Sequence, residues 1–174
     1  MSFKFKLDIE INEPNLDFVD VAGQRRARRA AEISAAGGHN FLMIGPPGVG
    51  KTMIAERLPS ILPPLSKEET LEVTAIHSIT NSDRAPLSTY APFIAPHHST
   101  TRIAMVGGGA HAIKPGVCSL AHRGVLFIDE APDQRGIIVV QLLAPTADQS
   151  TAFGIGFAGL GFEPGRTFRI DLAR

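Results

Sequence analysis

Residues 45–52 have the types and the spacing of a loop that binds phosphate groups. The segment reads Gly-Pro-Pro-Gly-Val-Gly-Lys-Thr and fits the pattern G-x-x-x-x-G-K-[ST] at every fixed position. In such a loop the glycines let backbone N–H groups turn toward a β-phosphate. Lys51 would add a positive charge between the β- and γ-phosphates, and the Thr52 hydroxyl would hold Mg²⁺. The pattern predicts that a nucleoside triphosphate is bound by Gly45, Pro46, Pro47, Gly48, Val49, Gly50, Lys51 and Thr52.

The segments on either side of this loop favour the same interpretation. Residues 41–44 form a continuous apolar run, typical of a buried strand, and residues 52–58 are expected to form a short helix that Pro59 ends. Upstream, a helix is expected over about residues 23–36, followed by a glycine stop. A chance glycine-rich turn would need neither the strand nor the helix, so we prefer the phosphate loop.

A second apolar run, residues 125–128, is followed directly by the carboxylates of Asp129 and Glu130. Asp129 could hold the Mg²⁺ shell, and Glu130 could polarise the water that attacks the γ-phosphate. Ligands of α/β sheets sit at the carboxyl ends of the strands, where both the loop and this pair are expected. We therefore interpret them as two halves of one hydrolytic site, rather than as acidic residues that only cap a helix start.

These two buried strands, each followed by loop and helical material, predict an α/β fold with a parallel sheet and helices on both faces. Residues 1–16 are interpreted as an N-terminal alternating strand and linker. Residues 66–69 have the form of a capping box, which predicts a helix from there to about Asn81. His97 and His98, if they lie on a strand, face opposite ways, so we expect structural or hydrogen-bonding roles rather than metal binding.

Charge and composition set few limits on the partners of the chain. Lys+Arg and Asp+Glu both number 17, so no overall field selects nucleic acid or an acidic membrane. Four arginines crowd residues 25–29, which we interpret as a solvated helix face rather than a nucleic-acid patch. The single cysteine, Cys118, excludes an internal disulfide framework and suits a reducing cytosol. We expect no membrane helix and a cytoplasmic location.

Several further segments give the chain a family resemblance. They are Asp-Val-Ala-Gly-Gln at 20–24, Ala-Ala-Gly-Gly-His-Asn at 35–40, Leu-Pro-Ser-Ile-Leu-Pro-Pro-Leu at 58–65, Ala-Pro-His-His at 95–98, Val-Gly-Gly-Gly at 106–109 and Ser-Leu-Ala-His-Arg-Gly at 119–124. With the phosphate loop and the acidic pair, they resemble the Mg-chelatase-like AAA+ ATPases of the ComM competence-protein type, over roughly residues 17–132. The loop and the pair then correspond to the Walker A and Walker B motifs.

The resemblance implies a hexameric ring of identical subunits with ATP bound between neighbours. It also implies that Val21 and Gly23 lie near the adenine and that residues 107–116 belong to an insertion in helix 2. ComM-type proteins act on DNA as helicase-like motors, whereas chelatase subunits drive metal insertion into porphyrin. Three hypotheses stay open: an ATPase module linked to DNA processing, a chelatase-type ATPase, and a catalytically silent nucleotide-binding module.

Residues 132–174 match the family pattern poorly. Residues 139–143 could be an eroded helix and residues 162–173 the next strand, while the G-x-G-x-x-G within 153–161 lacks the strand and helix of a dinucleotide fingerprint. We expect residues 17–174 to form a partial AAA+ domain, incomplete at its C-terminus, as in the product of a truncated or frameshifted gene. Because the family's arginine finger and sensor residues lie further on, we expect Mg-ATP binding with very slow hydrolysis.

Overall fold

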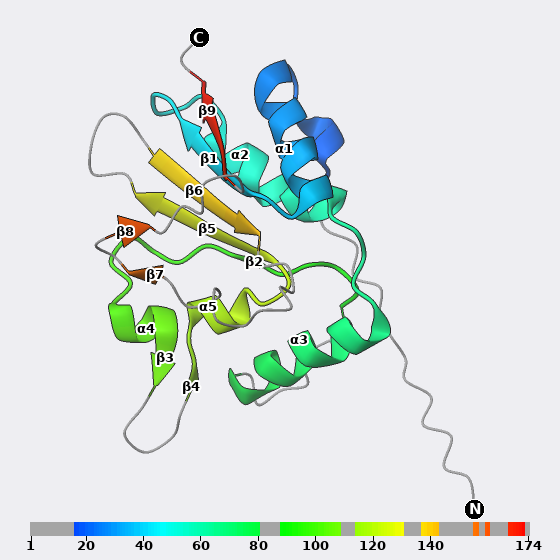
Figure 1. The fold of residues 1–174 in the computed structure, drawn as a ribbon, viewed down its shortest axis with the longest axis vertical. Helices are drawn as coiled ribbons and strands as arrows, with labels where there is room; N and C mark the ends of the chain where they lie inside the picture. The colour runs from blue at the N-terminus through cyan, green and yellow to red at the C-terminus, as the bar shows by residue number, and fades with distance from the viewer. Residues whose placement is uncertain are drawn as a thin grey trace, which may run out of the picture.

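The computed structural model describes residues 16–80, 88–108, 114–130, 137–142, 155–156, 159–160 and 167–172. Their centre is a five-stranded sheet in the order β2-β5-β6-β1-β9 (Figure 1). Its strands are β1 (Asn40–Ile44), β2 (Phe93–Ile94), β5 (Val125–Glu130), β6 (Ile137–Leu142) and β9 (Thr167–Asp171). Two smaller sheets pair β3 (Gly107–Gly108) with β4 (Lys114–Pro115), and β7 (Ile155–Gly156) with β8 (Gly159–Leu160). The N-terminal strand expected within residues 1–16 lies outside the described residues.

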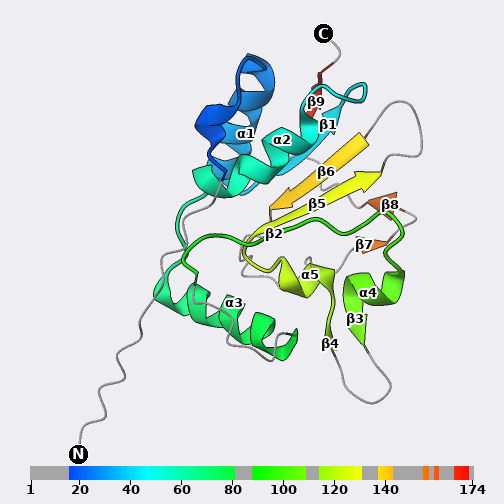
Figure 2. The same ribbon diagram turned by 180° about the vertical axis from the view of Figure 1, so that it is seen from behind.

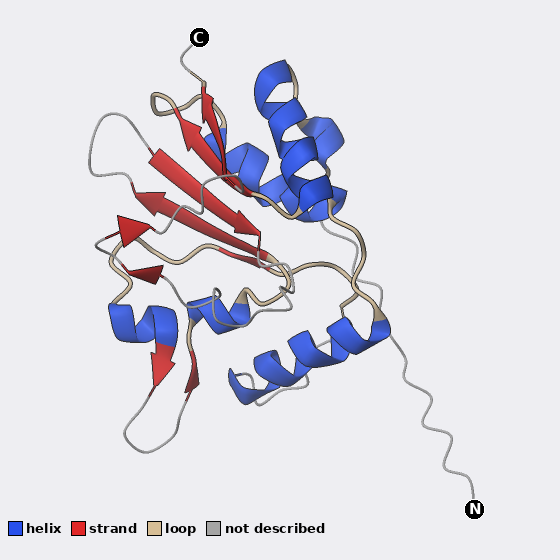
Figure 3. Ribbon diagram, viewed as in Figure 1, coloured by secondary structure: helices blue, strands red, loops and turns tan. Residues whose placement is uncertain are grey.

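The helices form two groups, one beside each outermost strand of the sheet. They are α1 (Arg25–Gly37), α2 (Lys51–Arg57), α3 (Lys67–Thr80), α4 (Arg102–Val106) and α5 (Val117–Leu120), with the 3₁₀ turns η1 (Phe18–Asp20) and η2 (Leu58–Ile61). From both sides, α1 and α2 lie beside the end with β1 and β9, whereas α3, α4 and α5 lie beyond β2 and β5 (Figures 1 and 2). Figure 3 shows the same arrangement with helices in blue and strands in red. The predicted α/β fold is confirmed.

Helix α1 forms where the sequence predicts it, because small apolar residues recur on one of its faces. Ala27, Ala30 and Ala31 are buried, and the helix ends at Gly38, whose φ of 62° is the left-handed conformation favoured by glycine. The buried face joins a core cluster with Phe41 of β1 and with residues of α2 and β5. This packing fixes α1 against the strand that leads into the phosphate loop.

Strand β5 is buried on both faces, as a continuous apolar run predicts. Val125, Leu126 and Phe127 are all buried, although successive strand residues point to opposite faces. Val125 and Phe127 join the core cluster of α1 and α2, so the alternate face of β5, with Leu126, packs elsewhere. The strand runs to Glu130, so the acidic pair forms its last two residues instead of following it.

One strand of the sheet departs from the expected parallel arrangement. β6 runs antiparallel to both of its neighbours, β5 and β1, whereas β1 pairs parallel with β9 and β2 pairs parallel with β5. The eroded helix expected over 139–143 is therefore wrong. The run Ile-Ile-Val-Val at 137–140 is β-branched, which favours a strand and disfavours a helix. The strand expected within 162–173 is confirmed as β9.

Helix α3 begins with the predicted capping box. The Ser66 N–H donates to Glu69 Oε2 at 2.7 Å, and the Glu69 N–H donates to Ser66 Oγ at 3.2 Å. Two backbone N–H groups that no turn of the helix could satisfy are thus bound by side chains. The cap fixes where α3 starts.

Replacing this cap gives a test of stability. Ser66→Ala should lower the free energy of unfolding by about 1 kcal/mol, because one helix N–H loses its acceptor. Chemical denaturation followed by circular dichroism measures the change. Ser78→Ala, near the other end of α3, is the matched control and should change stability less; equal losses from the two variants would contradict the capping role.

Candidate functional site

The loop between β1 and α2 depends on two glycines with left-handed backbone conformations. The φ angle is 82° at Gly48 and 88° at Gly50. Gly50 is the N-cap residue directly before α2, so the turn from loop to helix requires a conformation that other residues rarely adopt. The strand, loop and helix predicted around residues 45–52 are all present.

Lys51 opens α2, and its side chain folds back over the loop. The Nζ group donates to the carbonyl oxygens of Gly45 at 2.8 Å and of Pro46 at 2.9 Å, and the residue is only 7% exposed. A buried ammonium needs such acceptors, because burial of an unpaired charge is costly. The positive charge is thus held within the turn of the loop.

The start of the loop is also held from behind by β9. The Leu172 N–H donates to the Ile44 carbonyl at 2.7 Å, which extends the pairing of β1 with β9 to the last residue before the loop. A Cβ atom added to Gly45 would lie 3.0 Å from Leu172 Cβ and 3.3 Å from Val49 Cγ2. Glycine at position 45 therefore lets β9 and the loop approach closely.

Gln24 also holds this loop, and sequence reasoning missed it. Its side-chain Nε2 donates to the carbonyl of Val49 at 3.2 Å, from a backbone with φ of 44°. At the other end of the same segment, the Phe18 N–H donates to Ser60 Oγ at 2.9 Å. Only the motif Asp-Val-Ala-Gly-Gln around Gln24 could have signalled this contact.

Residues 18–24 are thus tied at one end to the phosphate loop and at the other to the turn after α2. Of the two positions expected near an adenine, Val21 is fully buried in the core, whereas Gly23 is exposed. Val21 therefore offers no exposed surface to a ligand in this structure, whereas Ala22 and Gly23 beside it are exposed.

Asp129 and the loop lie at the same side of the sheet, where the carboxyl ends of β5 and β1 meet. Asp129 is in register with Ile138 of β6, and Ile138 is in register with Met43 of β1. Glu130 is level with Ile44 in the same way, through Ile137. Because β5 and β1 each run antiparallel to β6, they run parallel to each other. Their carboxyl ends therefore lie at one edge, about 10 Å apart across two strand spacings.

Asp129 shares its face of β5 with Val125 and Phe127, which pack in the same core cluster as Ile54 of α2. The acidic side chain is therefore on the side of the sheet that carries α2. Its Oδ1 atom is buried and has no hydrogen-bond partner among the described residues. Buried carboxylate oxygens are nearly always satisfied, so this atom fits a ligand such as Mg²⁺ or a water bound to it. Thr52, the other expected ligand, is exposed on α2.

The histidines are arranged differently from the expectation. His97 and His98 follow β2 in a turn, in which the Thr100 N–H donates to the His97 carbonyl, instead of lying on a strand. Their ring centroids are 3.9 Å apart, so the inference that they face opposite ways is wrong. His97 Nδ1 is 2.7 Å from Ser99 Oγ, as the expected hydrogen-bonding role requires. Among the described residues, no group of three or more His, Cys, Asp or Glu side chains could hold a metal ion.

The single cysteine and the membrane-helix expectation can also be compared with the structure. Burial raises the pKa of the Cys118 thiol, so this half-buried cysteine is held in its less reactive protonated form. Within the described part of the chain, no helix has the length and apolar character needed to cross a membrane.

Comparisons with known proteins agree with this geometry. The chain is 57% identical over 118 residues to the uncharacterized protein YifB of Salmonella typhimurium, which covers 67% of the chain and 23% of that protein. It is 55% identical over 123 residues to an uncharacterized protein of Mycobacterium tuberculosis, covering 70% of the chain and 24% of the relative. The competence protein ComM of Haemophilus influenzae is 47% identical over 122 residues, covering 68% and 23%. The match thus spans about a quarter of the length of these relatives.

The family model described as "Magnesium chelatase, subunit ChlI" matches residues 17–153, which is more than half of the chain. This range includes the phosphate loop, β5 with its acidic end, and β6. Members of this family are AAA+ ATPase-type proteins. The chain therefore belongs to the magnesium chelatase, subunit ChlI, family, and its α/β sheet is the AAA+ type of P-loop fold.

Proposed function

We propose that this AAA+ module binds Mg-ATP at the edge of the sheet shared by the loop and Asp129. The observation that carries the proposal is that a buried lysine lies at the same edge as a carboxylate oxygen that has no partner among the described residues. Phosphate oxygens would replace the Gly45 and Pro46 carbonyls as acceptors for Lys51. Charge-assisted bonds to phosphate are stronger than bonds to neutral carbonyls, so this exchange favours the bound state.

The remaining groups of the loop would bind the nucleotide around this lysine. The backbone N–H groups of residues 45–52 would surround the phosphates, and the segment with Val21 and Gly23 would lie beside the base. Thr52 and Asp129 would hold Mg²⁺, which neutralises charge on the phosphates when bound. Glu130, the last residue of β5, would polarise the attacking water.

We further propose that the module works in a homo-oligomeric ring in the cytoplasm and acts in DNA processing. The 47% sequence identity to the competence protein ComM supports DNA as the substrate class. The name of the matching family supports the second candidate, a chelatase-type ATPase that drives metal insertion into porphyrin. Both candidates use the same nucleotide site and differ in the partner that stimulates it.

Replacing the lysine tests the nucleotide site. Lys51→Ala should abolish measurable binding of ATP, because no other side chain in the loop carries a positive charge to the phosphates. Isothermal titration with Mg-ATP measures the affinity. Lys67→Ala, which removes an exposed lysine at the start of α3, is the control and should bind normally. Unchanged affinity in Lys51→Ala would refute this site.

Replacing Gln24 tests the tie between the segment 18–24 and the loop. Gln24→Gly and Gln24→Asn both tolerate the left-handed backbone, but neither side chain reaches the Val49 carbonyl. We expect about fivefold weaker ATP binding in both, since a hydrogen bond contributes about 1 kcal/mol. Thermal denaturation should show that both variants stay folded. Wild-type affinity in the two variants would mean that the contact does not help to order the loop.

ATP turnover distinguishes the candidate functions. The chain is mixed with a full-length relative, and turnover is measured with DNA or with porphyrin-chelatase subunits. We expect stimulation by DNA, and less of it when the chain carries Glu130→Gln, because this control removes the proposed base from one component only. Stimulation by chelatase subunits would favour the second candidate. ATP binding with no contribution of the chain to turnover in any mixture would identify a silent module.

A further inference from the structure

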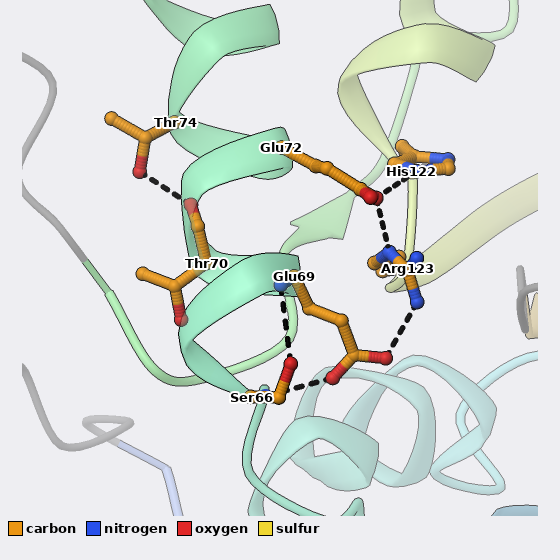
Figure 4. Close-up of polar contacts among 7 residues, drawn as sticks. All are labelled: Ser66, Glu69, Thr70, Glu72, Thr74, His122 and Arg123. Atoms are coloured by element: carbon orange, nitrogen blue, oxygen red, sulfur yellow. Dashed lines mark hydrogen bonds and ion pairs between the residues drawn. The ribbon is translucent and has the colours of Figure 1, made fainter.

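A cluster of ionic contacts joins α3 to the turn that precedes β5. The Arg123 guanidinium donates from Nη1 to Glu69 Oε1 at 2.5 Å and from Nε to Glu72 Oε2 at 2.7 Å (Figure 4). His122 Nε2 lies 3.4 Å from the same Glu72 oxygen. These contacts connect residues fifty or more positions apart in the sequence.

Both carboxylate oxygens of Glu69 are bound, so its side chain is held beside this arginine. Its second oxygen, Oε2, accepts the Ser66 N–H of the capping box, so one carboxylate serves both the helix start and the guanidinium. The guanidinium also holds the pKa of Glu72 below its usual range, with a smaller contribution from His122. Glu72 therefore stays ionised at neutral pH, as its contact with the guanidinium requires.

The backbone of Arg123 is in an unfavourable conformation. Its φ is 57°, the left-handed region that residues other than glycine rarely adopt. Its partners Glu69 and Glu72 remain partly exposed, and exposed ion pairs add little stability. The strain and the ionic contacts are of similar size, so this cluster adds little to the stability of the fold. Its effect is to fix the position of the turn before β5.

That position is the start of β5. The next residue, Gly124, is packed so closely on Pro92 that a side chain there would collide with the Pro92 carbonyl. The same carbonyl accepts the Val125 N–H at 2.8 Å, and the N–H of Gly124 donates to Ala121 at 2.9 Å. On the other side of the turn, His77 Nε2 is 2.9 Å from the Leu120 carbonyl. The turn is thus held between α3 and the segment that leads into β2.

We propose that Arg123, through Glu69 and Glu72, is a positioning residue that sets where β5 begins and thereby where Asp129 lies at its end. The inference rests on the proposed function, since Asp129 is there a group that holds Mg²⁺. A strand transmits a shift along its length because its backbone is extended. β5 is paired with β2 at Val125 and Leu126 and with β6 from Val125 to Glu130. Displacing Asp129 would weaken the Mg²⁺ contribution to binding and leave the loop's own contacts with phosphate unchanged.

The test compares ATP affinity with Mg²⁺ and with EDTA, in the full chain, by isothermal titration. Arg123→Gly keeps the left-handed backbone without strain and removes the guanidinium. In EDTA, we expect the ATP affinity of the variant to stay within about twofold of wild type. The gain in affinity that Mg²⁺ gives should fall by about tenfold, because a small misplacement of a site group has a large effect on its contribution. Arg123→Lys should not restore the gain, because a single ammonium cannot make the two-pronged contact.

Two further variants separate positioning from a general loss of stability. Glu72→Gln removes one charged partner without touching the capping box, and an intermediate fall in the Mg²⁺ gain is expected. Arg29→Ala removes the exposed ion pair of α1, Arg29 with Glu32 at 3.0 Å, and should leave the gain unchanged.

The outcomes distinguish this inference from the proposed function. An unchanged Mg²⁺ gain in Arg123→Gly, or equal losses with Mg²⁺ and with EDTA, would overturn the positioning role while the nucleotide site stands. A wild-type chain that binds no ATP under either condition would overturn the proposed function and, with it, this inference.

Discussion

The backbone ladder that β6 makes with β5 and β1 determines the geometry of the site. It places Asp129 level with Met43, and Glu130 level with Ile44, the last residue before the loop. A slip of one residue in either pairing would turn Asp129 toward the opposite face of the sheet, away from α2. The position of the acidic pair relative to the phosphate loop therefore depends on this register.

Around this ladder, the loop is held by two groups outside its motif and by its own lysine. Leu172 fixes its first residue from behind, and Gln24 binds Val49 within it. Lys51 closes the turn from inside by binding two loop carbonyls. A loop that is ordered in this way loses less conformational entropy when a ligand enters, which favours binding.

The parts of the site predicted from the sequence are those set by local residue patterns. The run 41–44, the glycines at 48 and 50, and the capping box at 66–69 each specify their own conformation over a few residues. The acidic pair could be placed at the correct edge because a buried apolar run with a charged end indicates a strand end.

The remaining parts depend on contacts that no local pattern contains. The direction of β6 is set by its two neighbours, and β2 is too short to give a periodic signal. Gln24 and Arg123 act from left-handed backbones onto partners far along the chain, so only the folded structure reveals them. The expectation for His97 and His98 holds only on a strand, and β2 ends before them, at Ile94.

The antiparallel pairing of β5 with β6 also has a consequence for the order of folding. The two strands are close in sequence, since β5 ends at Glu130 and β6 begins at Ile137, so their pairing closes a short loop. The pairing of β6 with β1 joins segments far apart in the chain. It is slower, because closing a long loop costs more conformational entropy. We expect the acidic half of the site to form as a hairpin and the phosphate loop to form with α2, so that docking of β6 onto β1 completes the site.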